Sequence, residues 1–182
     1  MQAARPSDLA LSPLRLLAGR DLRSFAGLAD PTSLDDVAAV FDLDRSWHGQ
    51  GALGSARHRT DWFNASAAGF ARGARIWANH GTVVLIDATD VVLVEPLPSL
   101  LDALGEPETR LNSFQGTFEV EANEYVYAGR GLTLYVNRAV DMQLRIAAFA
   151  PSSLERYQRD LRLDLQMKRL PPSRGPSGGR LP

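Results

Sequence analysis

Two stretches of this chain, 75–95 and 125–145, align with each other at a constant offset of 50 residues and without a gap. Trp77 falls on Tyr127, and the apolar positions of the following segments coincide. Each copy reads as two strands joined by a short polar turn, with an aromatic residue shortly before it. A chain that uses one α/β unit twice usually builds a single sheet from both copies. The repeat therefore predicts one sheet with a broad surface more readily than a catalytic pocket.

Strands are predicted from period-2 alternation of apolar and polar residues. The expected strands cover 75–79, 82–87 and 91–95 in the first copy, and 124–128, 132–137 and 143–149 in the second. Two more strands are expected, around Asp61-Trp62-Phe63 and near 116–121, with loops filling the rest of the Gly-rich segment 47–73. The run Val83 to Ile86 is apolar throughout, which indicates either a central strand covered on both faces or a face held for a partner.

Short helices are predicted from capping signals. A first helix is expected from Ser12-Pro13 to a stop at Gly19, and a second after Thr32 or Ser33 with an aspartate three residues on. Two later helices are expected at 100–104, after a Ser99 cap, and from Leu154 to about Met167.

The sequence therefore predicts an α+β fold. Two similar helix-plus-antiparallel-meander units form one continuous sheet packed by short helices, with a C-terminal helix and a disordered tail. The predicted boundaries are a flexible N-terminus at 1–12, a first unit at 13–95, a second unit at 96–150, a C-terminal helix at 151–169 and a tail at 170–182. The tail is expected to be disordered because it is rich in proline and glycine.

The second unit carries a short motif: Leu-Leu-Asp-Ala-Leu-Gly-Glu-Pro at 100–107, then Tyr-Val-Tyr at 125–127, then an apolar strand at 132–137. This resembles the repeat unit of the β-lactamase-inhibitor-protein-like fold, which the small outer-membrane assembly lipoproteins of the SmpA/OmlA type share. The resemblance covers 99–150 well and 33–95 loosely. It implies a tandem sheet that presents a concave face to another protein.

The chain departs from both groups because it has no cysteine. The lipoproteins carry a lipid-modified cysteine and the secreted inhibitors carry disulfides. No contact residue of either group is therefore transferred to this chain, and the fold alone does not fix a function.

Composition narrows the function classes. Hydrophobic residues make up 45% and charged residues 23% of the chain, as in soluble globular proteins. A formal net charge of -1 offers no global attraction to nucleic acid or to anionic membranes. The absence of cysteine excludes disulfides, thiolate zinc sites and cysteine nucleophiles. No apolar run has the length of a signal peptide or a membrane span, so we expect a cytoplasmic protein without a membrane partner.

No established catalytic or cofactor motif is recognisable. His48, His58 and His80 lack the spacing of metal ligands, so no metal is expected. His58 and Asp61 could form a general base, but no nucleophile motif accompanies them. The segment 49–54 matches G-x-G-x-x-G by letter but follows no predicted strand, so no cofactor is expected.

Charges and aromatic residues separate into two regions. Between Glu95 and Glu124 seven acids face one base, which indicates either an acidic patch for a basic partner or a solvated rim. Arginines and aromatic residues alternate over 57–77, a mixture that suits a protein interface or RNA. The near-zero net charge favours a protein partner over nucleic acid.

The leading hypothesis is a non-enzymatic protein-binding module, in its concrete form an immunity-type inhibitor that binds and occludes a cognate toxin or enzyme. A structural or adaptor subunit of a larger assembly is the alternative, and an enzyme using the Arg57 to Trp62 region is the third hypothesis. The candidate partner-binding residues are Trp62, Phe63, Arg72, Arg75, Trp77, Tyr125, Tyr127 and Tyr135.

Overall fold

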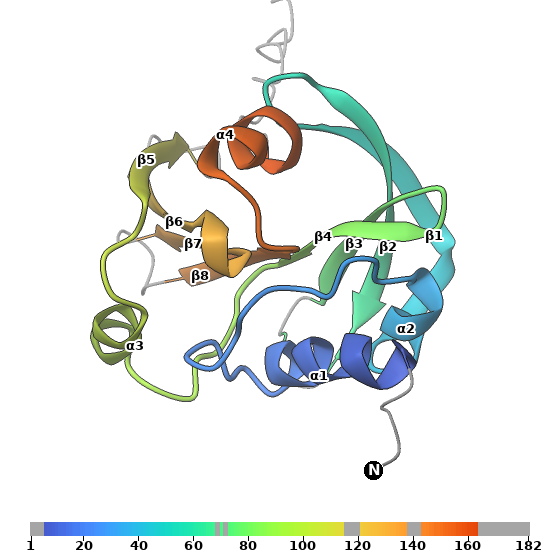
Figure 1. The fold of residues 1–182 in the computed structure, drawn as a ribbon, viewed down its shortest axis with the longest axis horizontal. Helices are drawn as coiled ribbons and strands as arrows, with labels where there is room; N and C mark the ends of the chain where they lie inside the picture. Colours follow the sequence, from blue (N-terminus) through green and yellow to red (C-terminus); the bar gives the residue numbers. More distant parts are fainter. Residues whose placement is uncertain (1–5, 68–69, 71–72, 115–120, 138–142, 164–182) are drawn as a thin grey trace, which may run out of the picture.

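The computed structural model describes residues 6–67, 70, 73–114, 121–137 and 143–163. These residues form one eight-stranded antiparallel sheet with short helices on its two faces (Figure 1). The α+β class and the single continuous sheet are confirmed.

The helices are α1 (Pro6–Ala18), α2 (Leu34–Ala38), α3 (Leu97–Leu104) and α4 (Leu154–Arg156), with a 3-10 turn η1 (Ala128–Arg130) and a π-helical turn η2 (Tyr157–Leu161) that continues α4. The strands are β1 (Asp42–Leu53), β2 (His58–Ser66), β3 (Ala74–Asn79), β4 (Thr82–Ala88), β5 (Thr109–Phe114), β6 (Glu121–Tyr127), β7 (Leu132–Asn137) and β8 (Gln143–Phe149).

The strand order is β1-β2-β3-β4-β8-β7-β6-β5. The sheet thus consists of two four-stranded meanders that meet at β4 and β8, where Leu85 pairs with Phe149. The alignment at offset 50 places β3 and β4 on β6 and β7, which hold different positions within their meanders. That the two meanders are copies of one unit stays a prediction.

Apolar residues form a core on each face of the sheet. The larger core lies under α1, α2 and α3 and includes Leu14, Val37 and Leu100 from those helices. The smaller core lies under α4 and η2, where Tyr157 stacks on Phe149 with 5.1 Å between ring centroids. Figure 1 shows α1, α2 and α3 on one side of the sheet and α4 on the other.

Strand β4 lies at the centre of the sheet, which is one of the two alternatives that the apolar run Val83 to Ile86 left open. Val83 and Ile86 face the larger core and Leu85 faces the smaller one. Because both faces of the strand are covered, apolar side chains are needed at nearly every position.

Of the two predicted caps of α2, Thr32 and Ser33, the structure uses Ser33. Ser33 Oγ accepts a hydrogen bond from the Asp36 backbone N–H at 3.1 Å, and the Asp36 carboxylate accepts one from the Ser33 N–H at 2.9 Å. This reciprocal pair satisfies two donors that a helix start otherwise leaves unpaired.

The first helix differs from the prediction. It begins at Pro6 and runs through Pro13 without a break, so 6–12 are helical instead of flexible. A proline inside a helix removes one hydrogen bond, which normally ends the helix. Here Ala10, Leu14 and Leu17 are buried in the core, and that packing outweighs the local preference.

Two further predicted elements differ from the structure. The segment 91–95 is no strand, since only Val91 forms an isolated bridge, to Phe70. Helix α3 starts at Leu97 after Pro96 instead of at a Ser99 cap.

The last predicted helix ends at Leu161, because Arg162 is extended and its neighbour Leu163 bridges to Leu53. The predicted strand near 116–121 falls largely outside the described residues, and the edge strand β5 lies earlier in the chain. The predicted tail 170–182 also lies outside them.

The Gly-rich segment 47–73 contains more regular structure than predicted. Most of it forms the long hairpin of β1 and β2, whose turn donates backbone N–H bonds from Gly54, Ser55 and Ala56 to carbonyls of the η2 region. In the described part of the chain, no helix combines the length and the apolar character that crossing a membrane requires.

Candidate binding groove

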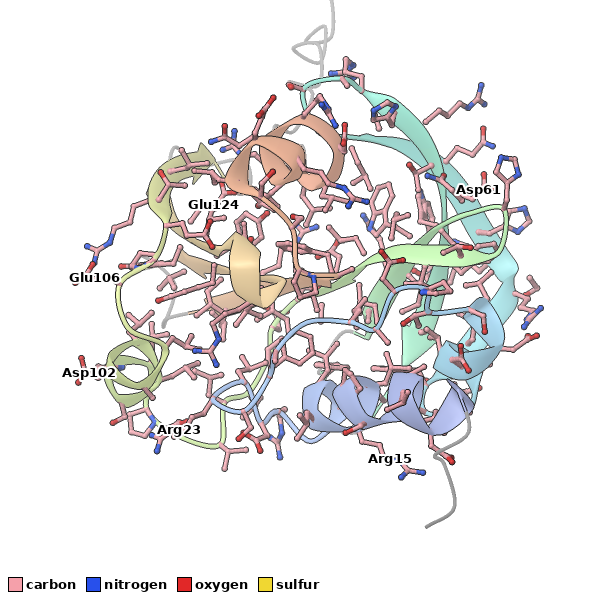
Figure 2. The ribbon with its side chains drawn as sticks, in the orientation of Figure 1. Arg15, Arg23, Asp61, Asp102, Glu106 and Glu124 are labelled. Atoms are coloured by element: carbon pink, nitrogen blue, oxygen red, sulfur yellow. The ribbon has the colours of Figure 1, made fainter. Side chains whose placement is uncertain are left out.

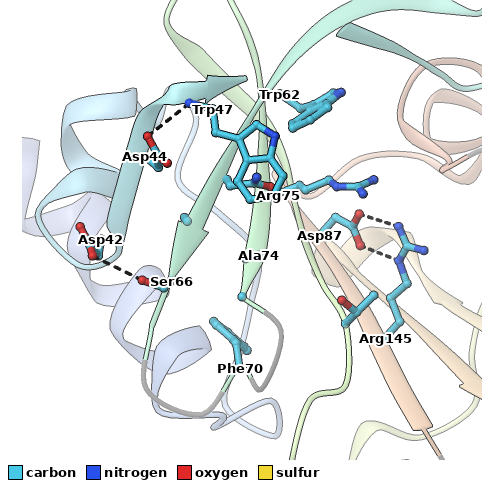
Figure 3. Close-up of a pocket in the computed structure, with 14 residues that line it drawn as sticks. Asp42, Asp44, Trp47, Trp62, Ser66, Phe70, Ala74, Arg75, Asp87 and Arg145 are labelled. Atoms are coloured by element: carbon cyan, nitrogen blue, oxygen red, sulfur yellow. Dashed lines mark hydrogen bonds and ion pairs between the residues drawn. The ribbon is translucent and has the colours of Figure 1, made fainter. Parts of the chain in front are cut away.

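The α4 segment covers only part of its face of the sheet, and a groove lies on the remaining part (Figure 3). Its volume is about 840 Å³, and its lining comes from β1, β2, β3, β4 and β8 together with Phe70, Gly73 and Thr89. A groove of this size is within the range of ligand-binding sites in proteins.

The strand register places a row of polar side chains across the floor of this groove. Asp44 pairs with Asn64, Asn64 with Arg75, and Arg75 with Asp87. Because directly opposite residues of antiparallel strands share a face, the four side chains belong to the same face. We call these four residues the polar row.

One end of the polar row is fixed by an ion pair. Arg145 donates from Nε and Nη2 to the two oxygens of Asp87, both at 2.6 Å (Figure 3). The side chains are 2% exposed for Asp87 and 17% for Arg145. Burial alone would lower the pKa of Arg145, but the charge and hydrogen bonds of Asp87 outweigh it and raise that pKa. This bidentate pair holds the floor in one geometry.

Two tryptophans pack against β1 because two glycines leave room for them. A Cβ atom at Gly49 would lie 2.4 Å from the Trp62 ring, and one at Gly51 would lie 2.8 Å from the Trp77 ring. The guanidinium of Arg75 lies 5.2 Å from the centroid of Trp62. Gly49 and Gly51, the first two glycines of the G-x-G-x-x-G match, therefore make room on β1 for tryptophans from β2 and β3.

A bulge in β1 presents a third tryptophan. Three extra residues separate the pairs made by Asp44 and His48. The carboxylate of Asp44 accepts hydrogen bonds from Ser46 N–H at 2.8 Å, Ser46 O–H at 2.6 Å and Trp47 N–H at 3.2 Å. The Ser46 hydrogen bonds lower the pKa of Asp44. The Trp47 side chain is 65% exposed and extends over the groove (Figure 3).

The part of the same face under α4 holds a buried chain of hydrogen bonds. Tyr157 O–H donates to Glu124 at 2.7 Å, so the Tyr157 oxygen accepts from Tyr135 O–H at 3.0 Å. Arg162 donates from Nη2 to Glu124 at 2.8 Å. Burial raises the pKa of both tyrosines, which keeps them protonated as donors. These polar groups are satisfied within the protein.

Two of the eight candidate partner-binding residues line the groove: Trp62 and Arg75. Trp77 belongs to the buried core beneath α4. Phe63 faces the opposite side of the sheet, in a small pocket beside α2. Arg72 lies outside the described residues.

The three candidate tyrosines are buried. Tyr135 is fully enclosed under α4. Tyr125 and Tyr127 lie on the other face beside α3, where Tyr127 O–H donates to the Gly105 carbonyl at 3.1 Å. In this conformation their rings support the sheet, and the groove itself is formed by other residues.

The candidate base His58 is not joined to Asp61. His58 Nε2 lies 3.1 Å from an Asp160 oxygen, while Asp61 accepts a hydrogen bond from Gln50 at 2.7 Å. An odd spacing along β2 places the two side chains on opposite faces of the sheet. Among the described residues, no cluster of three His, Cys, Asp or Glu side chains could hold a metal ion.

The acidic window from Glu95 to Glu124 does not form one patch. Glu124 is fully buried, whereas Asp102 and Glu106 project from the α3 side of the molecule (Figure 2). Glu95 pairs with Arg23.

Sequence reasoning missed Trp47, Asp87 and Arg145. A signal existed for the first: an aspartate two residues before a serine forms local side-chain turns, and such a turn within a strand indicates a bulge. A second signal was Asp87, an acid that directly follows the apolar run Val83 to Ile86.

Comparison with known proteins finds no matching family model, no matching curated protein and no matching solved structure. The groove offers two accessible indole rings and hydrogen-bonding groups of both kinds: carboxylates, an amide and a guanidinium. Such a surface can bind a polar ligand with apolar parts.

Proposed function

We propose that this protein is a non-enzymatic protein-binding module that uses the groove as its contact surface. The observation that carries this proposal is Trp47, a large indole held 65% exposed at the rim of a groove. Exposed aromatic side chains beside arginine are the commonest high-energy contacts of protein interfaces.

The groove is prepared for binding before a partner arrives. The Asp87–Arg145 pair, the glycine-seated Trp62 and the Asp44-capped bulge each have internal contacts that fix their geometry. A rigid contact surface loses little conformational entropy on binding, which favours affinity.

The narrower form of the proposal is an immunity-type inhibitor that occludes a cognate toxin or enzyme. The resemblance to the β-lactamase-inhibitor-protein-like repeat supports it, since that resemblance implies binding through a sheet face. If this form is correct, a gene adjacent to that of this protein should encode a toxin-like enzyme. The purified protein should then abolish the activity of that enzyme. If the purified protein bound that enzyme to saturation and left its activity unchanged, the inhibitor form would be wrong. The proposal of protein binding would still stand.

A structural or adaptor subunit is the second candidate, favoured by two apolar side chains outside the groove. Val92 and Val94, between β4 and α3, are 57% and 70% exposed. Light scattering after size-exclusion chromatography distinguishes the subunit hypothesis from the inhibitor hypothesis. If the protein self-associates and the double change Val92→Ser and Val94→Ser removes that self-association, the subunit hypothesis is supported. A protein that is monomeric at all concentrations supports the inhibitor hypothesis.

The binding proposal is tested by affinity capture from the native host at low salt. We expect the wild type to capture one protein that then binds the purified chain in calorimetry. Trp47→Ala should weaken that binding at least tenfold, as for an interface hot spot. Leu9→Ala is the matched control, because Leu9 is also a large apolar side chain that is 65% exposed, on α1. Capture of no protein, or equal binding by both variants, would overturn the proposal.

A further inference from the structure

Among the residues that the structure describes, the charges that line the groove do not balance one another. Five charged side chains line it: Asp42, Asp44, Arg75, Asp87 and Arg145. Asp87 and Arg145 neutralise each other, and Arg75 stacks on Trp62. Among the described residues, neither Asp42 nor Asp44 forms an ion pair with a cationic side chain.

The two carboxylates keep free hydrogen-bonding capacity. Asp42 is exposed and has a single long hydrogen bond, from Ser66 O–H at 3.5 Å. Asp44 uses only its Oδ1 atom to hold the bulge, which leaves Oδ2 for another donor. Both residues are in β1, on the strand from which Trp47 projects (Figure 3).

An exposed indole near two free carboxylates has a specific ligand preference. The face of an indole attracts a cation, most strongly a guanidinium or ammonium group, and carboxylates supply its counter-charge and hydrogen-bond acceptors. A neutral or acidic side chain at the same place would leave the carboxylates unpaired.

We propose that the groove selects a partner segment by one cationic side chain, arginine or lysine, which seats between the Trp47 indole and the carboxylates of Asp42 and Asp44. This inference rests on the proposed protein-binding function and names the chemistry of the partner.

The polar row defines how the rest of the segment lies. Its four strands span about 14 Å at a strand spacing of ~4.8 Å, which matches about four residues of extended chain. The Asn64 amide can both donate to and accept from a peptide group of that segment. Next along the row, on β3, Arg75 offers donors to a carbonyl or carboxylate. The expected occupant is an extended peptide that crosses the strands with its cationic residue at the β1 end.

The test uses isotope-labelled protein and capped pentapeptides that are identical except for the residue at one end, which is arginine, lysine, leucine or glutamate. The indole N–H signals of Trp47 and Trp62 report binding in NMR titrations. We expect saturable shifts with the arginine and lysine peptides and at least fivefold weaker binding of the other two. Trp47→Ala and Asp42→Asn should each weaken arginine-peptide binding by about 2- to 5-fold.

The matched controls lie outside the groove. Leu9→Ala removes an equally exposed apolar side chain, and Asp102→Asn removes an exposed carboxylate on α3. Both should bind the arginine peptide as the wild type does.

Three outcomes would overturn the inference. If all four peptides shifted the Trp47 signal with equal affinity, the proposed preference for a cation would be wrong. The proposal of protein binding would be unaffected. An unchanged affinity in Asp42→Asn has the same consequence. Shifts of the Trp47 and Trp62 signals by neutral oligosaccharides, with no response to any peptide, would assign the groove to another class of ligand. The capture experiment, by contrast, decides protein binding without regard to charge.

Discussion

One face of this sheet is built in two ways. Under α4 and η2, the polar groups of Glu124, Tyr157 and Arg162 bond to one another beneath a cover of chain. A few strands away, Trp47 and Asp42 remain exposed at an open groove. We call these regions the covered part and the open part.

The two parts differ in what their polar residues stabilise. Each contains a buried acid paired with an arginine: Glu124 with Arg162 and Asp87 with Arg145. In the covered part, that pair is joined by a tyrosine chain that ties η2 to the sheet. In the open part, the pair forms a fixed floor, while neighbouring charged and aromatic groups keep free surface. The covered part therefore supplies stability, and the open part supplies contact groups.

The largest effect is expected in the covered part. Tyr157→Ala removes both the ring stacked on Phe149 and the hydroxyl that bonds Glu124. We expect a loss of about 4 kcal/mol in the free energy of unfolding, as for other buried aromatic truncations. Tyr157→Phe, which keeps the ring, should lose about 2 kcal/mol. Urea unfolding followed by circular dichroism measures both.

Trp47→Ala is the matching change in the open part and should stay within about 0.5 kcal/mol of the wild type, because the side chain is mostly exposed. If Trp47→Ala destabilised the fold as much as Tyr157→Ala, the division between stability and contact would be wrong.

The second effect concerns the floor of the open part. Asp87→Asn leaves the mostly buried Arg145 without its counter-charge, and the expected cost is about 3 kcal/mol. Replacing both residues together, with Asp87→Leu and Arg145→Met, should cost less than the single change, since no unpaired charge remains. A loss of unfolding free energy in the double variant that equals or exceeds the loss in Asp87→Asn would show that the unpaired charge is not what destabilises the single variant.

A third effect separates the two glycines that seat the tryptophans. Gly51→Ala directs a methyl group against Trp77, which is buried, so we expect a loss of about 2 kcal/mol from overpacking. Gly49→Ala meets Trp62, which is only half-buried and can move into the groove. Its expected cost in thermal unfolding is less than half as large. A larger cost for Gly49→Ala would mean that Trp62 is held as firmly as Trp77.

Local sequence signals predicted the strands in which apolar and polar residues alternate. The bounds of β7 and β8 agree with the prediction because alternation and apolar content coincide there. The central place of β4 and the Ser33 cap of α2 were also predictable from adjacent residues. Each of these features depends on positions within a few residues of one another.

The open groove was not predictable in the same way. Its polar row exists only because Asp44, Asn64, Arg75 and Asp87, spread over 44 positions, come into register through strand pairing. The long strand β1 was hidden by its glycines, whose role is to admit tryptophans from other strands. Long-range pairing sets both features, and a single sequence carries no direct record of it.

The smallest effect tests the seam between the two parts, where β2 meets η2. Asp160 accepts hydrogen bonds from Arg159 and from His58, and these lower its pKa to about 2, from an ordinary value of 3.8. A depressed folded-state pKa contributes stability that is present above about pH 4 and is lost as the pH falls toward 2. Because both partners are largely exposed, we expect at most about 1 kcal/mol. The wild type should exceed Asp160→Asn by this margin at pH 6, and the two should converge at pH 2. A constant difference across that range would show that the seam is held by the backbone bonds of the β1–β2 turn, with no contribution from the carboxylate charge.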